Sequence, residues 1–168
     1  MAKHKRIETI TNIVQFCEVK DWLKLDTSYD DGIVNGVLEA AIAEAEVLTR
    51  HAVGRATYET TYDNFYRQIK LMPTVVSVSS VVYFDDDWEE HVFTDYNVGN
   101  AAVLPTEYPN TTVKQVKVSY VAENFGPVLK QLVRTLCLYH YEREPNKGLE
   151  QVIYNLANTI RTDWGSLA

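Results

Sequence analysis

Apolar residues recur every three or four positions near both ends of the chain, which is the spacing of one face of an α-helix. A short pattern over residues 18–25 and a longer one over residues 33–48 predict two helices in the first third. Asp30 and Asp31 are expected to cap the long helix, because carboxylates are favourable at the positive end of the helix dipole. Gly54 is expected to end this helix as a left-handed cap.

The apolar pattern changes to a period of two between residues 55 and 121, which is typical of β-strands. Four to six antiparallel strands are predicted here. Proline and glycine separate them at four positions, namely Pro73, Gly99, Pro105 and Pro109. Residues 85–87 are three aspartates, and we expect them to form the solvated tip of a hairpin.

Two more helices are predicted after the strands. A Gly-Pro dipeptide opens the first, over residues 126–144, because proline is favoured in the first turn of a helix. The second, over residues 149–164, has one strongly apolar face. This order excludes a parallel βαβ sheet and predicts an α+β fold over residues 1–168. About four helices form its core, which begins with a helical part over 18–54, and an antiparallel β subdomain over 55–121 is inserted between the second and third main helices.

The composition agrees with a single folded domain. The chain has 168 residues, of which 46% are apolar and 23% charged, as in ordinary globular proteins. No apolar run approaches the roughly 18 residues that cross a bilayer, so we expect neither a membrane partner nor a signal sequence. The basic N-terminus, which includes His4, is expected to be a mobile arm. Cys17 and Cys137 form no CxxC pair and are expected to be buried thiols in a reducing cytoplasm.

The net charge of −7 is unevenly distributed. Residues 71–113 contain seven acids and neither lysine nor arginine, whereas acids and bases balance in the rest of the chain. An acidic surface repels phosphates, so this stretch disfavours tight binding of nucleic acid. A surface along which DNA moves without being bound would also carry negative charge.

The densest polar cluster lies in this acidic stretch and consists of Asp85, Asp86, Asp87, Glu89, Glu90 and His91. Its oxygens suit a hard cation, but it lacks the central glycine and bidentate glutamate of a calcium loop, so a solvated turn is the preferred interpretation. His140 follows Cys137 by three residues and is interpreted as a core histidine beside a buried thiol. No signature of a nucleophile elbow, zinc protease, P-loop or dinucleotide fold occurs. We therefore expect no catalytic residue, metal or cofactor, and no enzymatic activity.

Four stretches have the order and spacing of a known family. They are EVKDWLKLD, with an acidic link and a long helix that closes in VGR; LMPTVVSVSSVVYFD; VKVSYVA; and FGPVLKQLVRTLCLYHYERE. Together they span most of residues 18–144 and resemble the head–tail connector proteins of tailed bacteriophages, also called head-completion or adaptor proteins. Glu123 and Asn124 stand where the family usually has a glycine, and the helix end at residues 141–143 is compressed.

The resemblance implies a structural virion protein. It implies a dodecameric ring that docks on the portal protein after DNA packaging and receives the tail or a stopper protein, with a central channel that DNA passes without specific binding. The expected location is the head–tail junction of the virion, and the host cytoplasm during assembly. Two alternatives stay open: a tail-terminator or stopper ring of the same neck region, and a small metal-dependent hydrolase that uses the cluster from Asp85 to His91.

The resemblance also suggests two interfaces. The C-terminal helix could dock on the portal through Ile153, Leu156, Ile160, Arg161 and Trp164. It could equally close the core of its own subunit, although the polar link at residues 145–148 favours docking. The second candidate is an acidic loop that faces the channel or the tail, formed by Asp85, Asp86, Asp87, Glu89 and Glu90.

Overall fold

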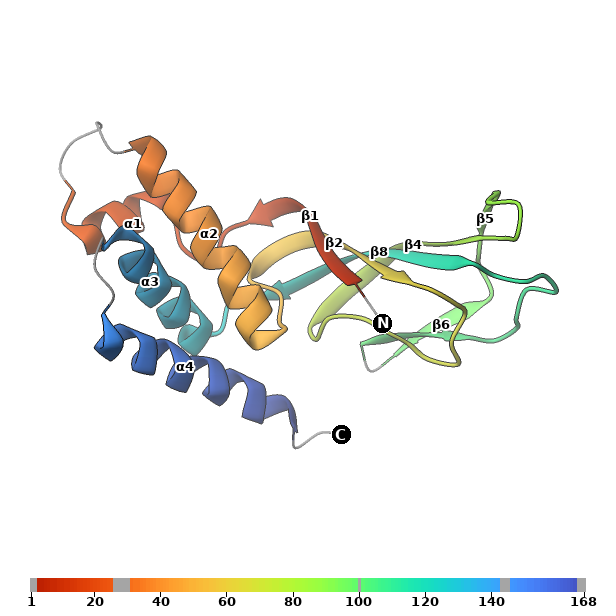
Figure 1. Cartoon of the computed structure of the whole chain (residues 1–168). Helices are drawn as coiled ribbons and strands as arrows, with labels where there is room; N and C mark the ends of the chain where they lie inside the picture. The colour runs from red at the N-terminus through yellow and green to blue at the C-terminus, as the bar shows by residue number, and fades with distance from the viewer. Residues whose placement is uncertain (1–2, 26–30, 100, 143–145, 166–168) are drawn as a thin grey trace. The chain divides into compact units, whose positions relative to one another are not determined.

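A computed structural model describes residues 3–25, 31–99, 101–142 and 146–165, with side chains in the last helix up to Arg161 (Figure 1). The chain divides into two compact units. The helical unit comprises Asn12–Gly54 and Asn124–Ala168, and the β unit comprises Met1–Thr11 and Arg55–Glu123. Among the described residues, no helix combines the length and the apolar character that a membrane span needs.

The helical unit contains α1 (Phe16–Leu23), α2 (Asp31–Thr49), α3 (Pro127–Tyr141) and α4 (Lys147–Gly165). Helix α3 packs against both α2 and α4, as Figure 1 shows. The four predicted helices and the α+β class are therefore confirmed.

One apolar cluster holds the helical unit together. It joins the inner faces of all four helices through residues such as Val19, Leu38, Leu132, Leu136 and Ile153. Each large side chain in such a cluster contributes roughly 1.5 to 3 kcal/mol through its removal from water.

The end of α2 differs from the prediction. The helix ends at Thr49, and Arg50 adopts the left-handed conformation, with φ of 60°, while its N–H donates to the Glu46 carbonyl at 2.8 Å. Gly54 also has a positive φ, of 69°, but it begins the next strand. The prediction that a left-handed residue ends the helix is correct, but this residue is Arg50 and lies four positions before Gly54. The sequence alone assigns the role to the nearest glycine.

The β unit contains two sheets. The larger has the strand order β1-β2-β8-β4-β5, and the smaller has the order β3-β7-β6. The strands are β1 (Lys3–Thr11), β2 (Gly54–Tyr62), β3 (Ile69–Lys70), β4 (Val75–Phe84), β5 (Glu90–Val92), β6 (Tyr96–Gly99), β7 (Ala102–Pro105) and β8 (Gln115–Asn124).

Alternation of buried and more exposed residues builds the core of the large sheet, as the two-residue period predicts. Tyr58 of β2 and Tyr120 of β8 are fully buried and stack with ring centroids 5.8 Å apart. Val116 and Val118 extend the same buried face along β8. These tyrosines are therefore packing residues of the sheet.

The prediction that the N-terminus is a mobile arm is wrong. Residues 3–11 form β1, which pairs antiparallel with β2 from Lys3 opposite Thr61 to Thr11 opposite Arg55. The β unit is thus built from the N-terminal segment together with the inserted segment.

Candidate functional site

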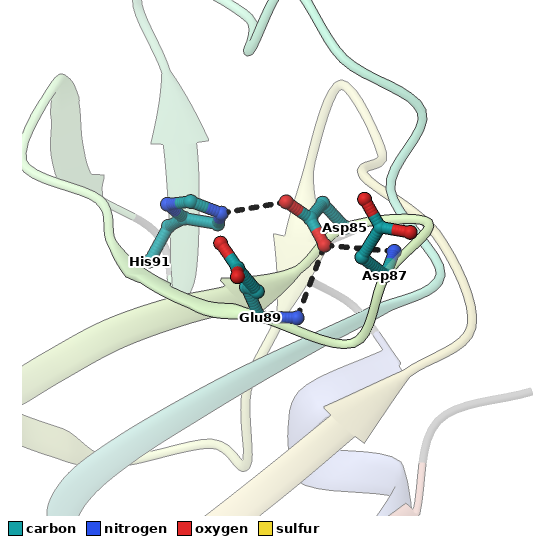
Figure 2. A network of polar contacts seen from close by, with 4 residues as sticks. All are labelled: Asp85, Asp87, Glu89 and His91. Atoms are coloured by element: carbon teal, nitrogen blue, oxygen red, sulfur yellow. Dashed lines mark hydrogen bonds and ion pairs between the residues drawn. The ribbon is translucent and has the colours of Figure 1, made fainter.

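The acidic cluster lies in the hairpin that joins β4 to β5, as predicted. The Asp85 carbonyl accepts the N–H of Trp88 at 3.1 Å, which closes the turn. One oxygen of the Asp85 carboxylate accepts the backbone N–H groups of Asp87 and Glu89, each at 3.0 Å. The other lies 2.8 Å from Nε2 of His91 (Figure 2). The side chain of Asp85 therefore organises the turn around it.

The contact with His91 favours the ionised form of Asp85. This hydrogen bond is the main cause that holds the pKa of the Asp85 carboxyl below its usual value, and the two backbone N–H groups act in the same direction. His91 in turn stacks on Tyr83 of β4, with ring centroids 5.0 Å apart. The ring is thus fixed from two sides, and Asp85 stays ionised at neutral pH.

The turn presents Trp88 to solvent. Trp88 has a φ of 63°, which is uncommon for a bulky residue, and it is 61% exposed. Its ring lies 6.3 Å from that of Phe84 at the end of β4. An exposed tryptophan held in an unfavourable backbone conformation is a feature that often accompanies a binding role.

Asp86, Asp87, Glu89 and Glu90 are exposed around this tryptophan. The Lys114 ammonium lies 2.8 Å from Asp86 and is the main cause that lowers the pKa of this carboxyl. The hairpin is therefore an acidic tip with an aromatic centre. Its charge suits a basic protein surface and opposes a phosphate backbone.

The metal alternative can be compared with this geometry. Asp85, Glu89 and His91 can bring ligand atoms within 4.8 Å of one another. However, both carboxylate oxygens of Asp85 already accept hydrogen bonds from the protein, and these bonds alone account for the position of the side chain. The arrangement matches a side chain that stabilises a turn.

The predicted portal-docking residues occupy different environments. Ile153 and Ile160 are each only 7% exposed and belong to the core of the helical unit, and Leu156 packs against the same core. Arg161 is exposed, and the side chain of Trp164 lies outside the described residues. The apolar face of α4 thus closes the core of its own chain, which was the second of the two alternatives. Contact of this helix with a portal stays a prediction.

Two predicted environments are wrong. His140 lies outside the core, where its Nε2 is 2.7 Å from Glu44 of α2, because its position on α3 faces an acidic side chain and not the apolar cluster. Cys17 is exposed, whereas Cys137 is buried as expected. Burial raises the pKa of the Cys137 thiol to about 12.

The comparisons with known proteins support the fold. No family model matches the chain, and no curated protein matches it. Solved structures that do match include the neck of an empty gene transfer agent (GTA) particle computed with C6 symmetry and the virion of a native GTA particle. The first has a TM-score of 0.70 and 18% identity, over 92% of this chain and 94% of that chain. The second has a TM-score of 0.69 and 15% identity, over 91% and 94%. The resemblance to head–tail connector proteins is thus confirmed at the level of the fold.

Proposed function

We propose that this chain is a structural protein of the neck of a phage or phage-like particle. One observation carries the proposal: the likeness to a chain of a GTA neck extends over 92% of this chain and 94% of its neighbour. Such coverage includes both units, so the likeness does not arise from a common helical motif alone. The site chemistry agrees, because the acidic hairpin suits protein contacts.

Within the neck, the role that we propose is that of an adaptor ring. The ring docks on the portal after packaging, receives the tail or a stopper protein and lets DNA pass through its centre. The sequence resemblance to connector proteins supports this role, and a ring of twelve subunits is compatible with the C6 symmetry applied to the GTA neck. The net charge of −7 supports the passage of DNA, since a ring of acidic subunits would not retain phosphates.

A tail terminator or stopper ring is the second candidate, because the likeness to a neck applies to it as well. The two roles differ in what the protein stays attached to. An adaptor remains with the head when tails are absent, whereas a terminator remains with the tail.

Deletion of the gene in the strain that produces the particle tests the proposal. We expect heads and tails to accumulate separately, and complementation to restore joined particles. In a tail-deficient background, an adaptor should co-sediment with DNA-filled heads, and its absence from heads and presence on free tails would select the terminator role. Normal tailed particles in the deletion strain would overturn the neck function itself.

A further inference from the structure

The two edges of the large sheet carry opposite charge. Among the described strands, β1 and β5 form these edges. Strand β1 has three basic residues and a single acid, in the order Lys3, Lys5, Arg6 and Glu8. The hairpin that leads into β5, residues 85–90, has five acids and no base. Both edges belong to the β unit, so this relation does not depend on the position of the helical unit.

Strand β1 also exposes apolar side chains. All of its residues except Arg6 are exposed, including Ile7 at 52% and Ile10 at 49%. The pairing with β2 passes from Arg6 directly to Glu8 and from Thr9 directly to Thr11, so each isoleucine is the extra residue of a bulge. Bulges redirect side chains and are common where an edge strand has a special role.

The opposite edge offers apolar residues of its own. Trp88 is 61% exposed and Val92 is 74% exposed, and Glu89 and Glu90 lie between them. The β1 edge therefore combines isoleucines with lysines, and the hairpin edge combines a tryptophan and a valine with carboxylates. The two surfaces are complementary in charge and similar in apolar character.

We propose that the β1 edge of one copy docks on the β4–β5 hairpin of the next copy. This inference rests on the proposed function, because it assigns the contact by which the neck ring would close. A cyclic ring needs a heterologous interface, in which two different surfaces of the subunit meet. Surfaces at opposite edges of one sheet, with opposite charge, fit that requirement.

Like-with-like contacts are disfavoured by the same charges. Two β1 edges would bring Lys3 and Lys5 against lysines, and two hairpins would bring Glu89 and Glu90 against glutamates. Juxtaposed like charges are unfavourable in an interface. The contact is therefore directional, from β1 to hairpin, and it selects a ring over a symmetric pair.

Zero-length carbodiimide cross-linking of the full chain tests this contact. A carbodiimide joins a lysine amine directly to a carboxylate in contact with it, and a mixture of ¹⁴N- and ¹⁵N-labelled chains identifies intermolecular links by mass. We expect mixed-isotope links from Lys3 or Lys5 to Glu89 or Glu90. Their yield should fall as salt rises to about 0.5 M, since salt screens exposed charges. Absence of these links at low salt, or links only between like edges, would overturn the proposal.

Charge reversal gives a second test. The K3E/K5E variant has carboxylates on both sides of the proposed contact and the E89K/E90K variant has amines on both sides, so neither variant alone can form links between these four positions. A mixture of the two variants should recover them, because each then meets an edge of opposite charge. The K24E/K147E variant is the matched control: it makes the same change in net charge on the helical unit and should link as the wild type does. Equal losses in this control, or no recovery in the mixture, would contradict the proposal.

The two proposals fail separately. Neck location is decided by gene deletion, whatever contact holds the subunits together. If the chain is found in the neck and these links are absent, only the edge contact is wrong. If the β1 strand binds duplex DNA in place of a second copy, the wild type would bind DNA, K3E/K5E would abolish this binding, and the wild type would form no links from Lys3 or Lys5 to Glu89 or Glu90, which also overturns this inference.

Discussion

The imidazole Nδ1 of His4 lies 2.6 Å from the hydroxyl oxygen of Thr60, its register partner on β2. The Thr60 oxygen is in turn 3.0 Å from the hydroxyl of Tyr120 on β8, which accepts the N–H of Met72 at 3.3 Å. Thr60 and Tyr120 are fully buried. A chain of hydrogen bonds thus connects three neighbouring strands and attaches the N-terminal strand to the core of the β unit.

This network predicts that the β unit loses stability in mild acid. His4 is exposed as a whole residue, but its Nδ1 lies against Thr60 in a partly buried contact, and the desolvation of the ring lowers the pKa of His4 below its ordinary value of 6.5. The unfolded chain therefore binds the proton more readily, so the stability is complete above about pH 6.5 and falls as the pH decreases toward the folded-state pKa. NMR titration of the His4 ring should give a midpoint below 6.5, and a midpoint at or above it would contradict the prediction.

Urea unfolding at pH 7.5 and pH 5.5 measures the consequence. Burial also lowers the pKa of His51 in the helical unit, so both histidines contribute to the pH dependence. The His4→Gln variant should therefore show a weaker decrease in stability between these two pH values than the wild type, but should keep the part that His51 supplies.

The turn at Asp85 should be the most sensitive point of the acidic hairpin. In Asp85→Ala, the N–H groups of Asp87 and Glu89 lose their acceptor, so their amide hydrogens should exchange faster with solvent. Asp87→Ala is the matched control. Asp87 contributes only its backbone N–H to these hydrogen bonds, so the substitution should leave the amide exchange of Glu89 unchanged. The pKa of Asp85 is lowered by His91, so the turn should hold above pH 3.8 and loosen only as the pH falls through the folded-state value.

The elements that could be predicted from the sequence are those in which buried residues recur at a regular spacing along the chain. Val116, Val118 and Tyr120 alternate along β8 and are all buried. In α2 the predicted stripe began at Ile33, which is 57% exposed, and Val34 is buried in its place. A helix has 3.6 residues per turn, so a stripe counted at fixed intervals slips by one residue near the helix ends.

Strand β1 could not be predicted in this way. Its partner β2 lies about fifty residues away in the sequence, and two bulges, at Ile7 and Ile10, interrupt any period of two. The acidic hairpin was predictable, because a run of acids separated two apolar strands. The bond from His91 to Asp85 was not, since it depends on how the two strands are paired.

The two cysteines should differ sharply in reactivity. Cys17 is exposed, whereas Cys137 is buried and its pKa is raised to about 12, so Cys137 has almost no thiolate at neutral pH. A thiol reagent such as Ellman's should titrate one thiol rapidly in the native protein and two in guanidinium chloride. The Cys17→Ser variant should give none rapidly when native. Two rapidly reacting thiols in the native wild type would show that the helical unit opens.

The isolated protein should not bind duplex DNA at physiological salt. Its net charge is −7, and the acids of the hairpin have few basic neighbours. The basic residues at the N-terminus lie in β1, so their effect is tested by K3E/K5E and not by deletion of a strand that the sheet needs. Fluorescence anisotropy with a labelled duplex in 0.15 M salt should show no binding for either protein. Micromolar binding that weakens with salt would contradict this.

Substitutions on the two faces of α4 decide which role its apolar residues have. Ile153 and Ile160 lie in the core, so Ile153→Ala or Ile160→Ala should each lower the free energy of unfolding by roughly 2 to 5 kcal/mol. Val152 and Tyr154 are 44% and 62% exposed, and their replacement by alanine should change it by no more than about 0.5 kcal/mol. These variants are matched controls on the same helix.

Truncation after Gly148 extends the same argument to the whole helix. It removes Ile153, Ala157 and Ile160 from the core of the helical unit at once and uncovers the apolar surface of α3. A domain is stabilised by only about 5 to 15 kcal/mol, so the loss of several buried side chains should abolish the cooperative thermal transition of this unit. Circular dichroism at 222 nm measures it. If the truncated protein kept a cooperative transition and merely failed to join portal rings, the apolar face would serve docking, and its packing in the chain's own core would be dispensable.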